Sequence, residues 1–450
     1  MKNPIPDYFI KLLFLSLCVL FVGNSVDAQK MDRIERERFK SMLTNVKNAV
    51  KKDYYDTNFH GINLDERFKT AADRLEQVNS TGEAMGVIAQ VLLDFDDSHL
   101  YFLPPATNID VEYGWRMQMH GDKCFVTIVK PKSDAEAKGL KVGDQILAIE
   151  NVSPNRKDLW KINYFYNIVG KRTNLRLSIL RPAESEPRQI QIESKIKQLV
   201  KVINIQMLLF DYFKEDTRSA VDFNYFKYVG NTTIWKMPTF AIPPDDIDTI
   251  MSKIKGGSLI LDLRGNGGGY VVTLERLAGY MFDKDLHIAE LKGRKEMKPQ
   301  KSKTKGKAAF AGKLIVLIDH NSGSAAEIFA RLVQLENRGI VLGDVSAGAV
   351  MQSRGFFTTT GANDEVIYGA SVTNADVIMS DGKSLEHIGV IPDERIIPTG
   401  EDLAKQRDPV LAKAIELAGG NVSADDAGKF FQYKWRENTK EQDIIEIVVK

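Results

Sequence analysis

A serine-bearing turn lies between a predicted buried strand and a predicted amphipathic helix. Residues 321–330 read N-S-G-S-A-A-E-I-F-A and follow the apolar run at 314–318 after two residues. A serine at a strand-to-helix junction presents its hydroxyl at the edge of a sheet, and the first N–H groups of the helix can stabilise an oxyanion. Ser324 is therefore a candidate nucleophile for acyl transfer. The alternative is structural: Ser322 or Ser324 caps the helix, and Glu327 completes a capping box with Ser324.

A glycine-rich loop is the second feature that could do chemistry. Residues 265–269 read G-N-G-G-G and follow the apolar run at 258–263. Consecutive glycines allow positive φ and close backbone approach, so such a loop can direct N–H groups at an anion or an oxyanion. No Lys-Ser or Lys-Thr pair follows, which excludes a phosphate loop, and the acidic partner of a dinucleotide fingerprint is missing. A plain tight turn is the alternative reading.

The histidines and cysteines predict neither a metal site nor a cofactor. The six histidines of the chain include no H-x-x-x-H or H-E-x-x-H spacing. Two cysteines are present, and Cys18 lies within a predicted leader, so Cys124 alone would remain in the mature chain. One cysteine supports neither a disulfide framework nor a Cys-based metal site. Cys124 lies in an alternating apolar run and is expected in the core.

The hydrophobic pattern predicts a multi-domain α/β protein. Residues 30–107 are expected to form a helical domain, because their apolar positions recur at helical spacing. Residues 108–198 change to short alternating strands with turn residues between them, which predicts a compact β-rich module. Residues 199–415 alternate apolar strands with helical segments, which indicates βα units on a mixed or parallel sheet. A tail at 416–450 ends in I-I-E-I-V-V, a candidate docked terminal strand.

Charge and leader patterns indicate an exported protein that does not bind nucleic acid. The formal net charge is +1 and the signs are mixed. The basic run at 292–307 lacks aromatics and is expected to be a solvated loop. Residues 1–28 combine lysines, an apolar block and small residues before a cleavage point, which is typical of a signal peptide. We expect a periplasmic or extracellular protein without stable membrane insertion once this segment is removed; an uncleaved anchor is the alternative. The sequence does not determine the oligomeric state, and a homo-oligomer is possible.

The middle region resembles a PDZ domain. Residues 137–149 read A-K-G-L-K-V-G-D-Q-I-L-A-I, close to the Gly-Leu and Gly-Asp turns of that family. PDZ domains bind an extended peptide as an added strand and hold its carboxylate on backbone N–H groups. The resemblance assigns Tyr113, Gly114 and Trp115 to the carboxylate-binding loop. It implies polypeptide partners, with the module selecting or gating substrate.

Taken together, the motifs resemble the tail-specific or C-terminal-processing serine peptidases, in particular their tricorn-like branch. The resemblance rests on D-D-S-H-L-Y-F at 96–102, the PDZ-like stretch, L-D-L-R-G-N-G-G-G at 261–269, S-A-A-E at 324–327 and E-H-I-G-V-I-P-D at 386–393. These motifs occur in the order of that family. The resemblance implies that the α/β core has a mixed sheet of the ClpP or crotonase type.

The resemblance also assigns roles around the serine turn. Ser324 matches the nucleophile, and Gly268 together with the N–H of Ala325 matches the oxyanion hole. The tail-specific branch uses a lysine as base about 25 positions after the serine. Ala349 occupies that position in this chain. A Ser-Lys dyad is therefore not expected here.

The tricorn-like branch instead uses a Ser-His pair and a glutamate, and Ser98, His99 and Glu386 match these positions. His99 would take the proton of the nucleophile, while Ser98 and Glu386 orient the imidazole. His320 and His387 are rival bases because one precedes the serine turn and the other adjoins Glu386. The remaining histidines are expected to be structural: His60, His120 and His287.

These assignments predict an exported serine endopeptidase that cleaves polypeptides and needs no cofactor. One alternative is a catalytically inactive relative that binds peptides or small apolar ligands, because the lysine of the tail-specific branch is missing. A structural or scaffolding PDZ protein is the other.

Overall fold

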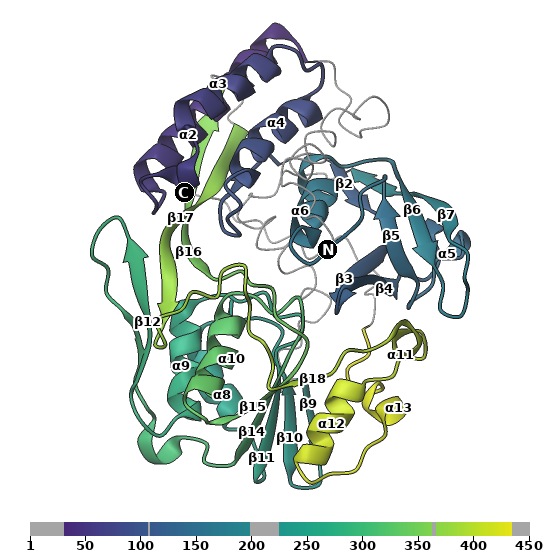
Figure 1. Ribbon diagram of the computed structural model, residues 1–450, viewed down its shortest axis with the longest axis vertical. Helices are drawn as coiled ribbons and strands as arrows, with labels where there is room; N and C mark the ends of the chain where they lie inside the picture. The colour runs from purple at the N-terminus through teal and green to yellow at the C-terminus, as the bar shows by residue number, and fades with distance from the viewer. Residues whose placement is uncertain (1–30, 107–108, 199–224, 362–365, 434–450) are drawn as a thin grey trace, which may run out of the picture.

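The structure is a computed structural model that describes residues 31–106, 109–198, 225–361 and 366–433. Three parts are visible in Figure 1: a group of helices at the top, a β-rich module on the right and an α/β core at the bottom. The predicted signal peptide and the candidate terminal strand at 444–449 lie outside the described residues. No helix in the described ranges is long and apolar enough to cross a membrane.

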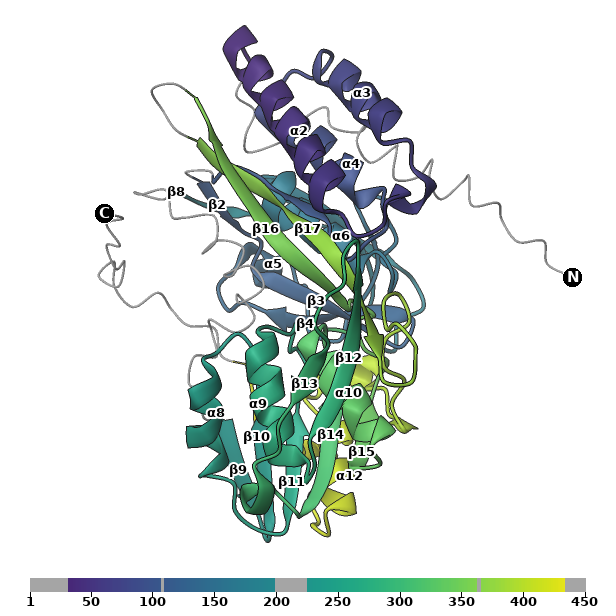
Figure 2. The same ribbon diagram turned by 90° about the vertical axis from the view of Figure 1, so that its left-hand side faces the viewer.

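The helical part forms as the sequence predicts. It contains α2 (Arg33–Asp53), the short 3-10 turn η1 (Phe59–Gly61), α3 (Leu64–Leu75) and α4 (Thr81–Leu93). Capping boxes begin α2 at Asp32 and α4 at Ser80, so the first backbone N–H groups of both helices have acceptors. Helix α2 lies along a long hairpin that rises from the core (Figure 2). The hairpin consists of β16 (Met351–Thr360) and β17 (Val366–Met379).

The middle module is an antiparallel sheet with strand order β3-β4-β5-β6-β7. Its strands are β3 (Trp115–His120), β4 (Lys123–Val129), β5 (Gln145–Ile149), β6 (Asn174–Leu180) and β7 (Arg188–Glu193). Its helices are α5 (Asp134–Ala137) and α6 (Leu159–Tyr164), and the π-helical turn η2 (Phe165–Val169) continues α6. The pair β2 (Ile109–Glu112) and β8 (Lys195–Gln198) closes the module at its entry and exit. The β-rich module is thus confirmed, and its PDZ identity stays a prediction.

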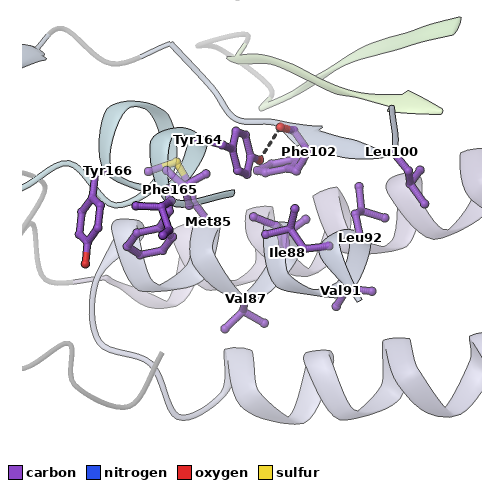
Figure 3. Packing of buried hydrophobic residues seen from close by; sticks show 14 of the residues in the cluster. Met85, Val87, Ile88, Val91, Leu92, Leu100, Phe102, Tyr164, Phe165 and Tyr166 are labelled. Atoms are coloured by element: carbon purple, nitrogen blue, oxygen red, sulfur yellow. Dashed lines mark hydrogen bonds between the residues drawn. The ribbon is translucent and has the colours of Figure 1, made fainter. Parts of the chain in front are cut away.

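The helical part and the module share one hydrophobic core. Figure 3 shows side chains of α4, including Ile88 and Leu92, beside Phe102 and the aromatic residues of α6 and η2. The Tyr164 hydroxyl donates to the backbone carbonyl of Phe102 at 2.7 Å. The sequence predicts these parts as separate units, but their buried residues form a single cluster. The module is therefore held against the segment that carries His99.

The core is built on a mixed six-stranded sheet with the order β18-β15-β14-β11-β10-β9. Its strands are β9 (Tyr225–Val229), β10 (Thr232–Lys236), β11 (Ser258–Asp262), β14 (Lys313–Ile318), β15 (Gly339–Gly343) and β18 (Glu394–Arg395). All neighbours are parallel except β9 and β10. The predicted mixed sheet is confirmed.

Helices cover both faces of this sheet. The central strands are buried on both sides, so their apolar residues run almost without interruption. One face packs against α8 (Pro244–Met251), α9 (Val271–Met281) and α10 (Ala325–Leu335). The other packs against α12 (Pro409–Leu417) and α13 (Ala424–Ala427), while α11 (Gly400–Ala404) lies toward the module (Figure 1). The predicted boundary at residue 415 falls inside α12, so packing onto the core continues past it.

A second sheet joins the core to the helical part. Strand β17 pairs with β16 on one edge and with β1 (Tyr101–Leu103) and β12 (Leu286–Gly293) on the other. The prediction of a solvated loop at 292–307 is wrong in part, because this run contains the end of β12, the edge strand β13 (Gln300–Ser302) and the start of the turn η3 (Gly306–Ala308). Exposed lysines on such an edge oppose pairing with other chains. Strand β1 begins two residues after His99, so its pairing fixes the segment of His99 relative to the core.

Candidate active site

The serine turn has the strained geometry expected of a nucleophile. It connects β14 to α10, and Ser324 adopts φ 52° and ψ −118° at the N-cap position. Positive φ is uncommon for a residue with a Cβ and is maintained only where the surroundings hold it. Ser322 is fully buried and its hydroxyl donates to the carbonyl of Leu263 at 2.9 Å. Of the two serines, Ser324 lines a cleft of about 2510 Å³ between the module and the core.

Glu327 holds the backbone around this serine. Its carboxylate accepts from the N–H of Ser324 at 2.9 Å, so the predicted capping box is present. The same carboxylate accepts from the Ser346 hydroxyl at 2.6 Å and from the N–H groups of Gly348 and Ala349 at 2.7 and 3.0 Å. Glu327 is fully buried, and burial raises its pKa to about 7 against these four donors. The sequence predicts only that Glu327 caps the helix. It does not predict that Glu327 joins the serine turn to the loop at 346–349.

The loop that Glu327 holds is the one in which the tail-specific branch has its lysine. Ala349 lies directly behind the nucleophile, because its carbonyl accepts from the Ser324 N–H at 3.0 Å. Lys236 also lines the cleft, but it forms an ion pair: its ammonium lies 3.3 Å from the buried Asp262 carboxylate. Neither position 349 nor Lys236 therefore supplies a lysine that could act as the base.

The glycine-rich loop packs against the serine turn. A Cβ on Gly268 would lie 2.6 Å from the Ser324 Cβ and 3.0 Å from the Ala325 nitrogen, and Gly268 has φ +99°. The N–H of Gly323 donates to the Asn266 carbonyl at 2.9 Å and fixes the two loops together. The N–H of Gly268 donates to the Asn266 side chain at 2.9 Å. Gly268 thus lies beside the candidate nucleophile. Its N–H could stabilise an oxyanion only after its hydrogen bond to the Asn266 side chain breaks.

Ser98, His99 and Glu386 form a hydrogen-bonded chain. The Ser98 hydroxyl donates to Glu386 Oε2 at 2.9 Å and lies 2.7 Å from His99 Nδ1. The Ser98 N–H and the Val350 N–H donate to the two oxygens of the same carboxylate at 2.9 and 2.8 Å. The three residues predicted to act together are therefore brought together, although Ser98 and Glu386 are 288 positions apart.

Burial sets the protonation of this chain. It lowers the pKa of His99, an effect that the charge of Asp97 opposes. It also raises the pKa of Glu386 to about 8, although the Ser98 and Val350 donors favour its charged form. His99 and Ser324 line the same cleft, and no hydrogen bond joins them in the described part of the chain. Such bonds are often completed only when substrate is bound.

The other histidines are less suited to act as the base. His320 lines the cleft, but burial lowers its pKa to about 4, and its Nδ1 has no partner among the described residues. His387 is half-exposed and lies 3.8 Å from Glu386, so it stays a rival. His60 is bonded to Tyr55 and to the carbonyl of Phe95, as a structural histidine would be. The described residues include no cluster of three or more His, Cys, Asp or Glu that could hold a metal.

The predicted peptide-binding loop opens into the same cleft. Tyr113, Gly114 and Trp115 all line it. Gly114 has φ +76°, and a Cβ there would lie 2.6 Å from the Ser133 Cβ. Tyr113 is buried and its hydroxyl accepts from the Arg172 N–H at 2.9 Å, which holds the loop in place; its part in binding a ligand stays a prediction. The indole N–H of Trp115 has no acceptor in the described ranges.

The module contacts both the segment of His99 and the loops around Ser324, and the sequence does not predict these contacts. On the histidine side, the Lys161 ammonium of α6 lies 3.0 Å from Asp96, three positions before His99. On the serine side, the Gln118 amide of β3 donates to Asp319 at 2.7 Å. Asp319 also accepts from the N–H of Gly265 at 2.9 Å, the first residue of the glycine-rich loop. Each contact lies within a few residues of a predicted catalytic group.

Comparisons with known proteins agree with this geometry. Residues 231–396 match the model of peptidase family S41. The chain is 27% identical over 312 residues to the tail-specific protease of Haemophilus influenzae, covering 65% of this chain and 42% of that protein. It is 26% identical over 287 residues to the carboxy-terminal processing protease CtpB of Bacillus subtilis, covering 61% of this chain and 56% of that protein. The chain thus spans about half the length of these curated relatives.

A solved structure supports the fold alone. The crystal structure of mature CPAF superposes with a TM-score of 0.61 at 13% identity, covering 82% of this chain and 94% of that one. The arrangement of helical part, β-rich module and α/β core is therefore shared beyond the matched family region.

Proposed function

Because the chain belongs to peptidase family S41, we propose that it is an exported serine endopeptidase with Ser324 as nucleophile and His99 as general base. The observation that carries the proposal is the hydrogen-bonded chain of His99, Ser98 and Glu386 in the cleft of Ser324. Ala349 at the position of the lysine leaves His99 as the base that the surrounding contacts orient. Polypeptides are the substrate class, and the PDZ-like module binds or gates them.

In this mechanism His99 Nε2 takes the Ser324 proton as the hydroxyl oxygen attacks the scissile carbonyl carbon. The carbonyl oxygen becomes an oxyanion, which the N–H of Ala325 and that of Gly268 would stabilise once Gly268 leaves Asn266. His99 then protonates the leaving amine, and the C–N bond breaks to give an acyl-enzyme. A water molecule deprotonated by His99 hydrolyses the ester and restores Ser324. The oxyanion hole and the export step are parts of the proposal.

Covalent labelling tests the nucleophile. A fluorophosphonate probe should modify the parent protein, and mass spectrometry should place the adduct on Ser324. Ser324→Ala should remove the label and reduce casein hydrolysis by about a thousandfold or more. Ser353→Ala is the matched control, because Ser353 lines the same cleft but its hydroxyl accepts from Ser371. A parent protein that is folded, unlabelled and inactive on casein would favour the inactive, peptide-binding relative.

A further inference from the structure

A buried carboxylate that the proposed mechanism does not use lies next to His99. Asp97 precedes His99 by two residues and is only 2% exposed. Its Oδ1 atom accepts from the backbone N–H of His99 at 2.8 Å. A carboxylate can stay charged inside a protein only where hydrogen bonds or opposite charges compensate for the lost water. The contacts of Asp97 therefore decide whether it can place a charge near the imidazole.

Two distant segments supply hydrogen-bond donors to this carboxylate. The hydroxyl of Tyr54, the residue that ends α2, donates to Asp97 Oδ2 at 3.0 Å. The hydroxyl of Thr373 in β17 donates to Asp97 Oδ1 at 2.7 Å. Burial and the charge of Asp97 raise the pKa of Tyr54, so its hydroxyl keeps the proton that it donates. These two hydroxyls and the His99 N–H all donate, which matches the acceptor-only, charged form of a carboxylate.

Asp97 and Glu386 are two buried carboxylates whose surroundings separate their roles. Burial raises the pKa of Glu386 to about 8, and the charge of Asp97 raises it further. Glu386 is therefore mostly protonated at neutral pH and cannot offset a positive charge there. Burial lowers the pKa of His99, and the charge of Asp97 opposes this effect. Two acidic groups that are held in different charge states can take different parts in one reaction.

Other ionisable side chains on the surrounding elements have partners of their own. They include Asp96, His60, Tyr55, Asp376 and His387. Asp96 pairs with Lys161 of α6 at 3.0 Å, and His387 lies 3.8 Å from the Glu386 carboxylate. The Tyr55 hydroxyl lies 2.9 Å from His60 Nε2, and burial raises the pKa of Tyr55, so this hydroxyl is uncharged. Asp376 accepts from the Ser384 hydroxyl at 2.7 Å.

We propose that Asp97 is a positioning residue: it fixes the backbone of His99, and its charge stabilises the imidazolium that forms when His99 takes the Ser324 proton. The catalytic part of this proposal rests on the proposed function, whereas the effect on the imidazole does not. At neutral pH Asp97 supplies the negative charge near His99. Above about pH 8 the Glu386 carboxylate adds a second one.

Titration of the imidazole tests the electrostatic effect without any activity. In the full chain carrying Ser324→Ala and carbon-13-labelled histidine, the NMR signal of His99 is assigned by its loss in His99→Gln. Asp97→Asn removes the charge and keeps a side-chain acceptor for the His99 N–H. The pH midpoint of His99 should therefore fall by about one pH unit, a tenfold lower proton affinity.

Thr373→Val is the matched control, because it removes one donor to Asp97 and keeps the charge. Its His99 midpoint should equal that of the parent, although its melting temperature should be lower. An unchanged midpoint in Asp97→Asn, or equal falls in both variants, would overturn the proposal. Asp97→Ser also removes the charge and gives the same comparison if Asp97→Asn does not fold. A parent whose His99 stays neutral down to pH 4 would also contradict the proposal.

Turnover at two pH values tests the catalytic part. With Ser324 intact, Asp97→Asn should lower kcat on casein about fivefold or more at pH 7 with little change in KM, and by less at pH 9. Glu386→Gln should show the reverse order, with the larger loss at pH 9, where the parent's Glu386 is charged. Equal losses at both pH values in Asp97→Asn would indicate a purely structural role. If the His99 midpoint moves as expected but no chain cleaves casein, the effect on the imidazole stands and the proposed peptidase function fails.

Discussion

At the scale of single residues, the direction of one hydrogen bond defines the proposed base. When Glu386 is ionised, the Ser98 hydroxyl donates to it and the Ser98 oxygen can only accept from His99, so Nδ1 carries the proton. The neutral imidazole then has Nε2 as its lone-pair nitrogen, the form required of a general base. Burial lowers the pKa of His99, which keeps this form populated at neutral pH.

The pH dependence of hydrolysis should report both groups of this chain. Activity should be lost as pH falls through the His99 pKa, below the ordinary value of about 6.5. A second rise should occur near pH 8, because the Glu386 carboxylate becomes charged only above its raised pKa of about 8 and then stabilises the imidazolium. Profiles of kcat/KM for the parent and for Glu386→Gln check this.

Glu386→Gln should lose the rise near pH 8 and keep the limb at lower pH. A lysine base would behave differently, since activity in both proteins would keep climbing beyond pH 9. Survival of full activity in His99→Ala would likewise remove His99 from the mechanism.

Glu327 should prove to be a positioning residue. Glu327→Gln would turn a side-chain N–H toward backbone N–H groups that now donate to the carboxylate, and each unmet donor costs about 1–3 kcal/mol. We expect a lower melting temperature and a kcat reduced at least about tenfold with a smaller change in KM. Ser346→Ala removes only one of the four donors and should have a milder effect on both. Equal effects of the two changes would argue against this role.

At the scale of elements, the glycine-rich loop and the serine turn act as one unit. The close approach of Gly268 to Ser324 leaves no space for a side chain. Glycine is thus required at this position by packing and by its positive φ. The neighbouring Gly267 has open space around its Cβ position.

Gly268→Ala should therefore abolish most activity, by about a hundredfold or more, while Gly267→Ala should retain most of it. Fluorophosphonate labelling rates and casein hydrolysis measure the effect, and circular dichroism confirms that both variants fold. Similar activities of the two variants would mean that the loop tolerates a shift at Gly268 and contributes little to catalysis.

A feature of the site can be predicted from the sequence when the residues that form it are close together along the chain. The turn of Ser324 is readable because a strand, a polar turn and a helix follow one another within about twenty residues. The chain of Ser98, His99 and Glu386 was predicted only by family resemblance, since nothing local joins positions so far apart. The four donors to Glu327 and the pair of Lys161 with Asp96 come from packing between distant segments. No periodicity or motif encodes these contacts.

At the scale of the whole molecule, the module contacts the segment that carries His99 through an ion pair between Lys161 and Asp96. Burial alone would raise the pKa of Asp96, but Lys157 and Lys161 hold it at about 2. Lys161 is nearly buried and also pairs with Asp158 at 3.1 Å, whereas Lys157 is 60% exposed. The pair of Lys161 with the half-exposed Asp96 should transmit changes in α6 to the segment of His99.

Lys161→Ala should lower kcat on short chromogenic peptides and on casein alike, because it leaves Asp96 less restrained beside His99. Lys157→Ala removes a solvent-exposed partner of the same carboxylate and should change either rate by less than about threefold. Steady-state kinetics on the two substrates check this. If Lys161→Ala impairs only casein cleavage, the module acts on substrate entry alone.

The distance in sequence between Ser98 and Glu386 has a consequence for when the protein can act. The carboxylate that orients His99 belongs to a segment made long after the imidazole, and strand β1 next to His99 pairs with β17 from the same late part of the chain. A nascent chain that has emerged only as far as the serine turn holds Ser324 and His99 without this support. If His99 is the base, as we propose, the contacts that orient it form only after β17 and Glu386 have been made, so the proposed peptidase activity is acquired late in biosynthesis.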